Sequence, residues 1–126
     1  MKIKMSNLDI YNNAIKLRDA FGNNIDIKIP IMVNYAIQKN LEILLAAAKT
    51  VDKVRCGIGE KYGNLSTEGE VYEISKENLD VAKHDLATLM ETEEMLDIRK
   101  IKLADLDGVQ LSNTQMAALL FMIEEE

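Results

Sequence analysis

The sequence predicts an α+β fold that is mostly α: a long antiparallel helical hairpin with short β-ribbons and a short C-terminal helix. Two observations support this fold class. Apolar residues recur at spacings of three and four over two long stretches, 31–62 and 79–96, which is the period of an amphipathic helix. Three short segments, 1–5, 25–29 and 101–103, instead alternate apolar and polar residues, which is the period of a strand.

Length and composition limit the number of domains and the class of partner. A chain of 126 residues is long enough for one modest core and too short for two ordinary ones, so we expect residues 1–126 to form a single domain. The net charge of −6 argues against the cationic surface that binds phosphate backbones or anionic lipid. We therefore expect neither nucleic acid nor a membrane as a partner.

The compartment is predicted from cysteine usage and from the absence of long apolar runs. Cys56 is the single cysteine, which excludes an internal disulfide and a multi-cysteine zinc site and fits a reducing compartment. Residues 1–13 lack the apolar core of a signal peptide, and no apolar run approaches the roughly 20 residues that cross a bilayer. We expect a cytoplasmic protein.

The first half of the chain predicts a strand, a helix, a second ribbon and a very long helix. Ser6 follows the first alternating segment and is placed to cap a helix that ends at Gly22. The ribbon at 25–29 ends at Pro30, which lacks a backbone donor and suits the first turn of a helix. The apolar pattern from Ile31 onward predicts a helix of roughly 45 Å, which either bends or meets another chain.

Glycines mark the end of this long helix. Gly57 and Gly59 weaken helix propensity, so we expect a bend or a close backbone contact there. Gly63 lies just past the last apolar position, where a left-handed residue normally caps the final carbonyls. The turn formers that follow, through Gly69, predict a return of the chain along the helix.

The second half of the chain predicts the partner helix and the C-terminal elements. Residues 71–74 are expected to be extended, and Ser75 is expected to cap a helix that runs to Leu96 and packs against the long helix. The segment KIKL at 100–103 resembles KIKM at 2–5, so we expect these two ribbons to pair. Residues 112–115 form a capping box that starts the last helix.

No pattern in the sequence predicts catalysis, a cofactor or a metal. The glycines at 57, 59 and 63 have the wrong spacing for a dinucleotide loop and end a helix instead of starting one. His84 falls on the polar side of its helix and has no neighbouring metal ligand. Cys56 has a basic neighbour but no base to activate it, so we expect a partly buried structural thiol. We expect a protein that is not an enzyme.

Two sets of residues are candidates for binding. The apolar stripes on few, long helices and the seven methionines indicate an interaction surface, although a methionine-padded core of a monomer would explain the same composition. The candidate interface residues are Ile37, Leu41, Leu44, Met116, Leu120 and Ile123. If the two matching ribbons pair, they form a basic patch on an acidic protein. The candidate ligand or anion contacts are Lys2, Lys4, Arg99, Lys100 and Lys102, together with Lys49, Lys53 and Arg55 on the long helix.

The order of elements resembles a group of small uncharacterised proteins encoded by phages and prophages of Gram-positive bacteria. The residues that carry this resemblance are KYG at 61–63, the following GEVY at 69–72 and IRKIKL at 98–103. The resemblance covers most of the chain as an order of elements, and it implies a shared fold more than a shared role. None of its motifs marks an active site, so no functional residue is carried over.

Two functions from different classes follow from these observations. The first is a non-enzymatic phage- or prophage-type accessory protein that acts through protein–protein interaction or homo-oligomer assembly. The alternative is a protein that binds or sequesters a small molecule, a nucleotide signal, in phage counter-defence, with a pocket between subunits. The acidic composition weakens the alternative, because phosphate binding requires Lys, Arg or helix N-termini.

Overall fold

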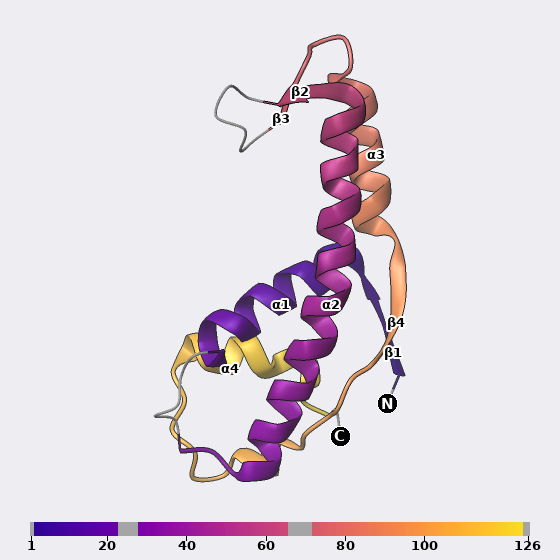
Figure 1. Ribbon diagram of the computed structural model, residues 1–126. Helices are drawn as coiled ribbons and strands as arrows, with labels where there is room; N and C mark the ends of the chain where they lie inside the picture. The colour runs from indigo at the N-terminus through magenta and orange to yellow at the C-terminus, as the bar shows by residue number, and fades with distance from the viewer. Residues whose placement is uncertain (1, 23–27, 66–71, 125–126) are drawn as a thin grey trace.

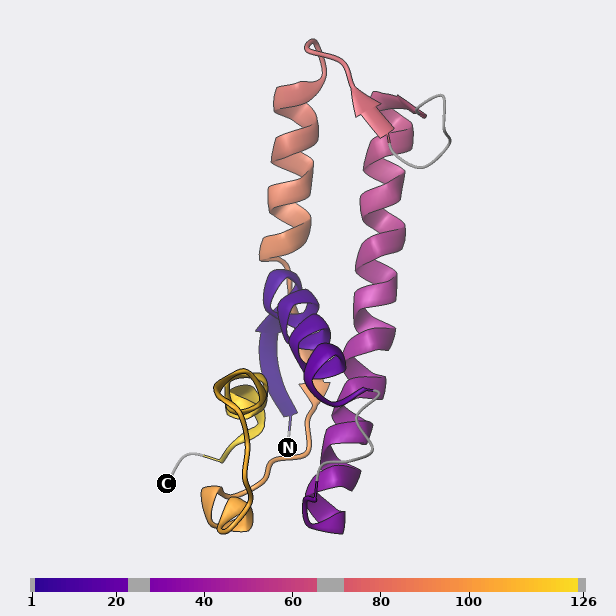
Figure 2. The same ribbon diagram turned by 90° about the vertical axis from the view of Figure 1, so that its left-hand side faces the viewer.

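A computed structural model of the chain describes residues 2–22, 28–65 and 72–124 (Figure 1). The fold is α+β and mostly α, as the sequence predicts. Its lower part is a compact base, in which the first half of a long helix packs with the N-terminal and C-terminal helices. Its upper part is a projecting pair of antiparallel helices, which we call the helical arm and define as residues 49–62 and 79–91 (Figures 1 and 2).

The N-terminal helix α1 (Asn7–Phe21) begins and ends where the sequence predicts. The Ser6 hydroxyl accepts a hydrogen bond from the Asp9 backbone N–H at 3.1 Å, which satisfies a free donor of the first turn. At the other end, the Gly22 N–H donates to the Arg18 carbonyl at 2.7 Å. The apolar side of α1 packs against α2 and α4.

The long helix α2 (Ile31–Tyr62) is one element of 32 residues, which at 1.5 Å per residue gives a length of about 48 Å. The helix continues through Gly57 and Gly59, and a Cβ atom added at Gly57 would meet nothing within 4 Å. The close approach lies instead at Gly63, where an added Cβ would be 2.5 Å from the Glu73 carbonyl oxygen. Gly63 has φ −137° and starts a strand, so the left-handed cap predicted there is wrong.

A small ribbon closes the tip of the helical arm. Strand β2 (Gly63–Leu65) pairs antiparallel with β3 (Tyr72–Ile74), as expected for an extended return at 71–74. The turn predicted through Gly69 and the alternating ribbon at 25–29 fall mainly on residues outside the described ranges. The tip is fastened to the helices by the Tyr62 hydroxyl, which donates to the Asp85 carboxylate at 2.7 Å, and by the Asn78 side chain, which donates to the Tyr62 carbonyl at 3.2 Å.

The helix α3 (Leu79–Glu91) packs antiparallel to α2, but it begins later and ends earlier than the apolar pattern predicts. It starts at Leu79, without a side-chain cap, whereas Ser75 was expected to cap it. Its end is set by the buried side chain of Asn7. The Asn7 amide donates to the Leu89 carbonyl at 2.8 Å, and the Asn7 backbone N–H donates to the Thr92 carbonyl at 2.8 Å.

This contact determines which strands pair. Strand β1 (Lys2–Ser6) runs antiparallel to β4 (Glu93–Asp97), with Ser6 opposite Glu93 and Lys2 opposite Asp97. The register continues directly from the contact between Asn7 and Thr92. Leu96 therefore lies in a strand and not in a helix, and the predicted pairing of 2–5 with 100–103 is wrong.

The C-terminal segment returns to the base through the 3-10 helix η1 (Leu103–Leu106), the helix α4 (Asn113–Leu119) and the 3-10 turn η2 (Leu120–Met122). The predicted capping box is present: the Ser112 hydroxyl accepts from the Gln115 N–H at 3.1 Å, and the Gln115 side chain accepts from the Ser112 N–H at 2.9 Å. Ile101 forms a single parallel bridge with Ile123, so the alternation around Ile101 marks a bridge and not a ribbon.

The hydrophobic core lies in the base. Side chains from α1, the first half of α2, the segment after β4 and the C-terminal helix fill it, and the largest fully buried apolar ones are Ile10, Leu17, Ile37, Leu44, Ile98, Leu119 and Met122. In the helical arm, the buried residues are Val51, Gly59 and Ala82. The base is therefore well packed, whereas the arm is a single thin layer of two helices.

Candidate functional site

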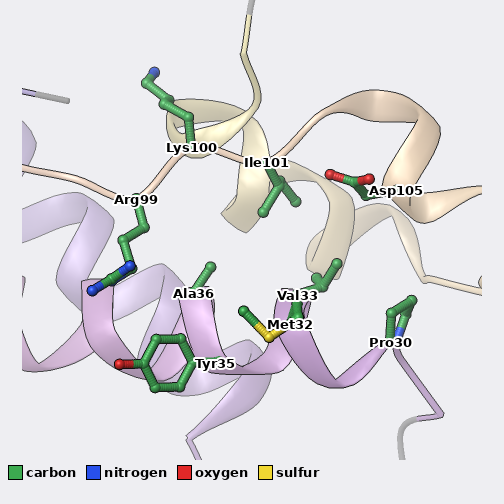
Figure 3. A pocket seen from close by; sticks show the side chains of 9 residues that line it. All are labelled: Pro30, Met32, Val33, Tyr35, Ala36, Arg99, Lys100, Ile101 and Asp105. Carbon is green, nitrogen blue, oxygen red and sulfur yellow. The ribbon is translucent and has the colours of Figure 1, made fainter.

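An open groove of about 400 Å³ lies between the first turns of α2 and the segment that follows β4 (Figure 3). We call it the α2 groove. One wall comes from the N-terminal end of α2, and the other comes from the chain between Arg99 and Asp105. The lining residues are Pro30, Met32, Val33, Tyr35, Ala36, Arg99, Lys100, Ile101 and Asp105.

The second wall is held in place by the side chain of Asn40, which is fully buried. Its Oδ1 accepts a hydrogen bond from the Arg99 backbone N–H at 2.8 Å, and its Nδ2 donates to the Arg99 carbonyl at 2.9 Å. The same Nδ2 lies 3.5 Å from the Met122 sulfur. The side-chain amide thus makes the two hydrogen bonds that a neighbouring strand would make to the Arg99 backbone, and it fixes this backbone beside α2.

The Arg99 side chain crosses toward α2 and lies on the ring of Tyr35, with its Cζ 5.1 Å from the ring centroid. Lys39, one turn further along α2, places its Nζ 5.9 Å from the same ring and 3.6 Å from the Glu42 carboxylate. A guanidinium over an aromatic face is attracted by the ring quadrupole and keeps its N–H donors available at the edge. Asp97 is an acidic neighbour of Arg99: the two residues line one hollow beside α2, and their opposite charges attract each other.

The other charged side chains of the α2 groove already have hydrogen-bond partners. The Lys100 Nζ donates to the Phe121 carbonyl at 2.8 Å, and in Figure 3 this side chain points away from Tyr35. The Asp105 Oδ2 accepts from the Lys102 backbone N–H at 2.9 Å, which stabilises the first turn of η1. Arg99 is therefore the cation of the groove that can meet an external anion at low cost.

Exposed apolar side chains surround the groove. Ile31 is 81% exposed, Met32 is 69% exposed and Leu103 is 55% exposed, although each is large and apolar. Met32 lines the groove, whereas Ile31 and Leu103 belong to the same two segments without lining it. Large apolar residues gathered at one place on a surface indicate a contact more often than a single exposed leucine does.

The basic residues predicted to gather on two paired ribbons lie on different segments, and the separate basic cluster predicted on the long helix lies on the helical arm. Lys2 and Lys4 lie on β1 against β4, whose sequence EEMLD is acidic. Arg99, Lys100 and Lys102 lie at or beside the α2 groove. Lys49, Lys53 and Arg55 lie on the helical arm, where Arg55 pairs with Asp52 at 3.1 Å and lies 5.8 Å from the ring of Tyr11. The pairing of β1 with an acidic strand places carboxylates among these cations, and the charges of both Lys2 and Arg99 act on the Asp97 carboxylate.

The apolar residues predicted as an interface are mostly used inside the chain. Ile37, Leu41 and Leu44 are buried in the core of the base. Met116 and Ile123 are half-buried and pack against that core, and Leu120 is exposed. The stripe on α2 was thus identified correctly as apolar, but its first half packs against α1 and α4.

Apolar side chains that the chain covers only in part also lie on the helical arm. Val54, Leu79, Val81 and Leu86 are between 37% and 48% exposed. Leu79 and Leu86 are seven residues apart, so they share one side of α3. In α3, Ala82 is the residue that is buried against α2. Sequence spacing predicts this stripe, and the structure shows that α2 covers it only in part, because Leu79 and Leu86 lie on the same side of α3 as Ala82 and remain 38% and 37% exposed.

The candidate catalytic side chains remain isolated on the arm. His84 is exposed, on the polar side of α3. Cys56 is also exposed, so the expectation of a partly buried thiol is wrong, because position 56 lies on the side of α2 that α3 does not cover. A side-chain hydrogen bond with Tyr62 raises the pKa of Lys61 above its ordinary value. In the described ranges, no group of three or more His, Cys, Asp and Glu residues could hold a metal ion.

Comparison with known proteins found no match among family models, curated proteins or solved structures. Of the helices within the described residues, none has both the length and the apolar character needed to cross a membrane.

Proposed function

We propose that the protein is a non-enzymatic cytoplasmic accessory protein of the phage or prophage type, which acts by homo-oligomer assembly or by binding a larger protein. The helical arm supplies the contact, and a second copy of the chain is its first expected occupant. The observation that carries this proposal is the apolar stripe of α3, which α2 covers only in part.

Packing energetics support an additional layer on the arm. Most helical stability in proteins comes from burying an amphipathic face, and an isolated helix of fewer than about 12–15 residues is marginal in water. Helix α3 has 13 residues and buries Ala82, while Leu79, Val81 and Leu86 keep a third or more of their surface in water. A second two-helix layer would cover the exposed parts of Leu79 and Leu86, which share one side of α3, and would form a four-helix bundle, which is a common way for such layers to associate.

The oligomeric state of purified protein tests this proposal. We expect native mass spectrometry and light scattering to give a dimer or a higher closed oligomer, and we expect the double variant Leu79→Glu, Leu86→Glu to be monomeric. The matched control is His84→Glu, Ala87→Glu, which adds two carboxylates to exposed positions of the same helix and should keep the wild-type mass. Circular dichroism should show that both variants remain helical.

Two outcomes would contradict the proposal in different ways. A wild-type chain that stays monomeric over the concentration range would exclude self-assembly, and only the binding of a larger protein would remain. A wild-type oligomer that both double variants leave intact would place the contact away from the stripe of α3. The alternative, sequestration of a nucleotide signal, has less support because carboxylates of β4 lie among the candidate phosphate contacts Lys2, Lys4 and Arg99.

A further inference from the structure

The α2 groove lies at the opposite end of α2 from the helical arm, and assembly through the arm does not use it (Figure 1). Three features of the groove need an explanation of their own. Its cation, Arg99, lies on the ring of Tyr35, its α2 wall carries the highly exposed Met32, and its second wall is fixed by a buried amide.

The Arg99 guanidinium is preorganised to bind a carboxylate. Asn40 holds its backbone on both sides, and the Tyr35 ring supports the guanidinium. Little side-chain freedom then remains to be lost on binding, which is the main cost that preorganisation reduces. A planar guanidinium binds a carboxylate through two parallel hydrogen bonds. Arginine and tyrosine are also among the residues that most often dominate binding energy at protein interfaces.

The shape of the groove favours a segment of a protein over a small molecule. Pockets for small molecules bury about 70–90% of the ligand surface, which requires walls on most sides. The α2 groove is half open to solvent, and the exposed Met32 extends its apolar surface on the α2 side. An extended or helical segment can cover such a rim, and methionine adapts its shape to different side chains.

We infer that the α2 groove binds a short segment of a partner protein that presents apolar side chains next to one carboxylate. The carboxylate meets Arg99, and the apolar side chains lie over the exposed Met32. The groove also gives the segment a direction, because Arg99 and Asp105 lie at opposite ends of it (Figure 3). An acidic side chain is favoured at the Arg99 end and opposed at the Asp105 end.

Selection from a random peptide library, with the full chain as bait, tests this inference. Wild-type protein should enrich peptides in which Asp or Glu lies beside two or more apolar residues. The most enriched peptide should then shift the amide NMR signals of Met32, Tyr35 and Arg99. The variant Arg99→Gln should bind it at least about tenfold more weakly, the loss expected for one charge-assisted contact. The control Lys16→Gln, an exposed cation on α1, should bind as the wild type does.

Each result supports or overturns the inference. Enrichment of apolar peptides without an acid, or equal binding by Arg99→Gln and Lys16→Gln, would remove Arg99 from recognition. Signal changes confined to residues 79–91 would place the peptide on the helical arm instead. Shifts of the groove signals by octanoate, together with no peptide enrichment, would show a small-molecule pocket and overturn the assignment to a protein segment. Because Met32→Asp alters an exposed rim position, it provides a second variant that should also lose the peptide.

Discussion

Replacing Asn40 by leucine should destabilise the protein by about 2–4 kcal/mol, because its side chain is the hydrogen-bond partner of the Arg99 backbone. Leucine has a similar shape, so the change removes the hydrogen bonds without opening a large cavity. Two bonds of 2.8 and 2.9 Å are lost, and each contributes about 1 kcal/mol net. The Arg99 N–H and carbonyl are then left without their partner, which adds about 1 kcal/mol or more where water does not reach them.

Urea unfolding followed by circular dichroism measures this loss as a lower midpoint at an unchanged slope. The matched control is Gln38→Ala, an exposed polar position two residues earlier on α2, and it should stay within about 0.5 kcal/mol of the wild type. A natural domain has about 5–15 kcal/mol of stability, so the variant should still fold. If Asn40→Leu costs less than about 1 kcal/mol, or no more than Gln38→Ala, the amide does not hold the wall of the α2 groove.

Three further predictions concern the two helices of the arm. Gly63→Ala should lower the thermal midpoint, because the new Cβ would meet the Glu73 carbonyl oxygen at 2.5 Å. Gly57→Ala places its Cβ in open space and should raise the free energy of unfolding by up to about 1 kcal/mol. Differential scanning calorimetry of both variants compares them directly. Asn7→Ala should cost about 1–3 kcal/mol in urea unfolding, since a buried donor to the Leu89 carbonyl is lost, and an unchanged midpoint would refute its role in ending α3. The Cys56 thiol should react with an aromatic disulfide reagent in the native protein within a few-fold of its rate in urea, and strong protection would mean that another chain or segment covers it.

Local sequence patterns predicted the helices of this fold well. The Ser6 cap, the Ser112 capping box and the helical period from Ile31 each depend on residues within a few positions of one another. Such signals are complete in the sequence, because capping and helical periodicity involve neighbours three or four residues apart. The length of α2 and its antiparallel packing with α3 followed from the same reasoning.

Contacts between distant residues were the part that the sequence did not specify. The end of α3 is set by Asn7, which is 82 residues away from Leu89 in the chain, and no local signal at residue 91 indicates it. The same contact selected 93–97 as the partner of β1, although 100–103 resembles the N-terminal segment more closely. Charge complementarity between a lysine-bearing strand and an acidic one was a signal that could have identified the pairing.

The candidate site was predicted only in part for the same reason. Arg99 was named as an anion contact, but its supporting residues, Asn40 and Tyr35, are 59 and 64 positions earlier in the chain, and no pattern links them. The apolar stripe of α2 was also identified, yet periodicity cannot say which half of a stripe the chain itself will cover. Here the half containing Ile37 is covered by α1 and contributes to the core of the base, and exposed apolar side chains remain at the start of α2 and on α3.

The distance between these two surfaces makes them separable by experiment. Met32 and Val54 are on the same helix, and 22 residues at 1.5 Å each place them about 33 Å apart. Sites separated by more than about 10 Å that share no partners usually have additive effects. The variant Leu79→Glu, Leu86→Glu should therefore bind the selected peptide within about twofold of the wild type, and Arg99→Gln should keep the wild-type oligomer. If breaking the oligomer also abolishes peptide binding, the groove is completed by a second copy of the chain, and self-assembly then forms the binding site instead of only multiplying it.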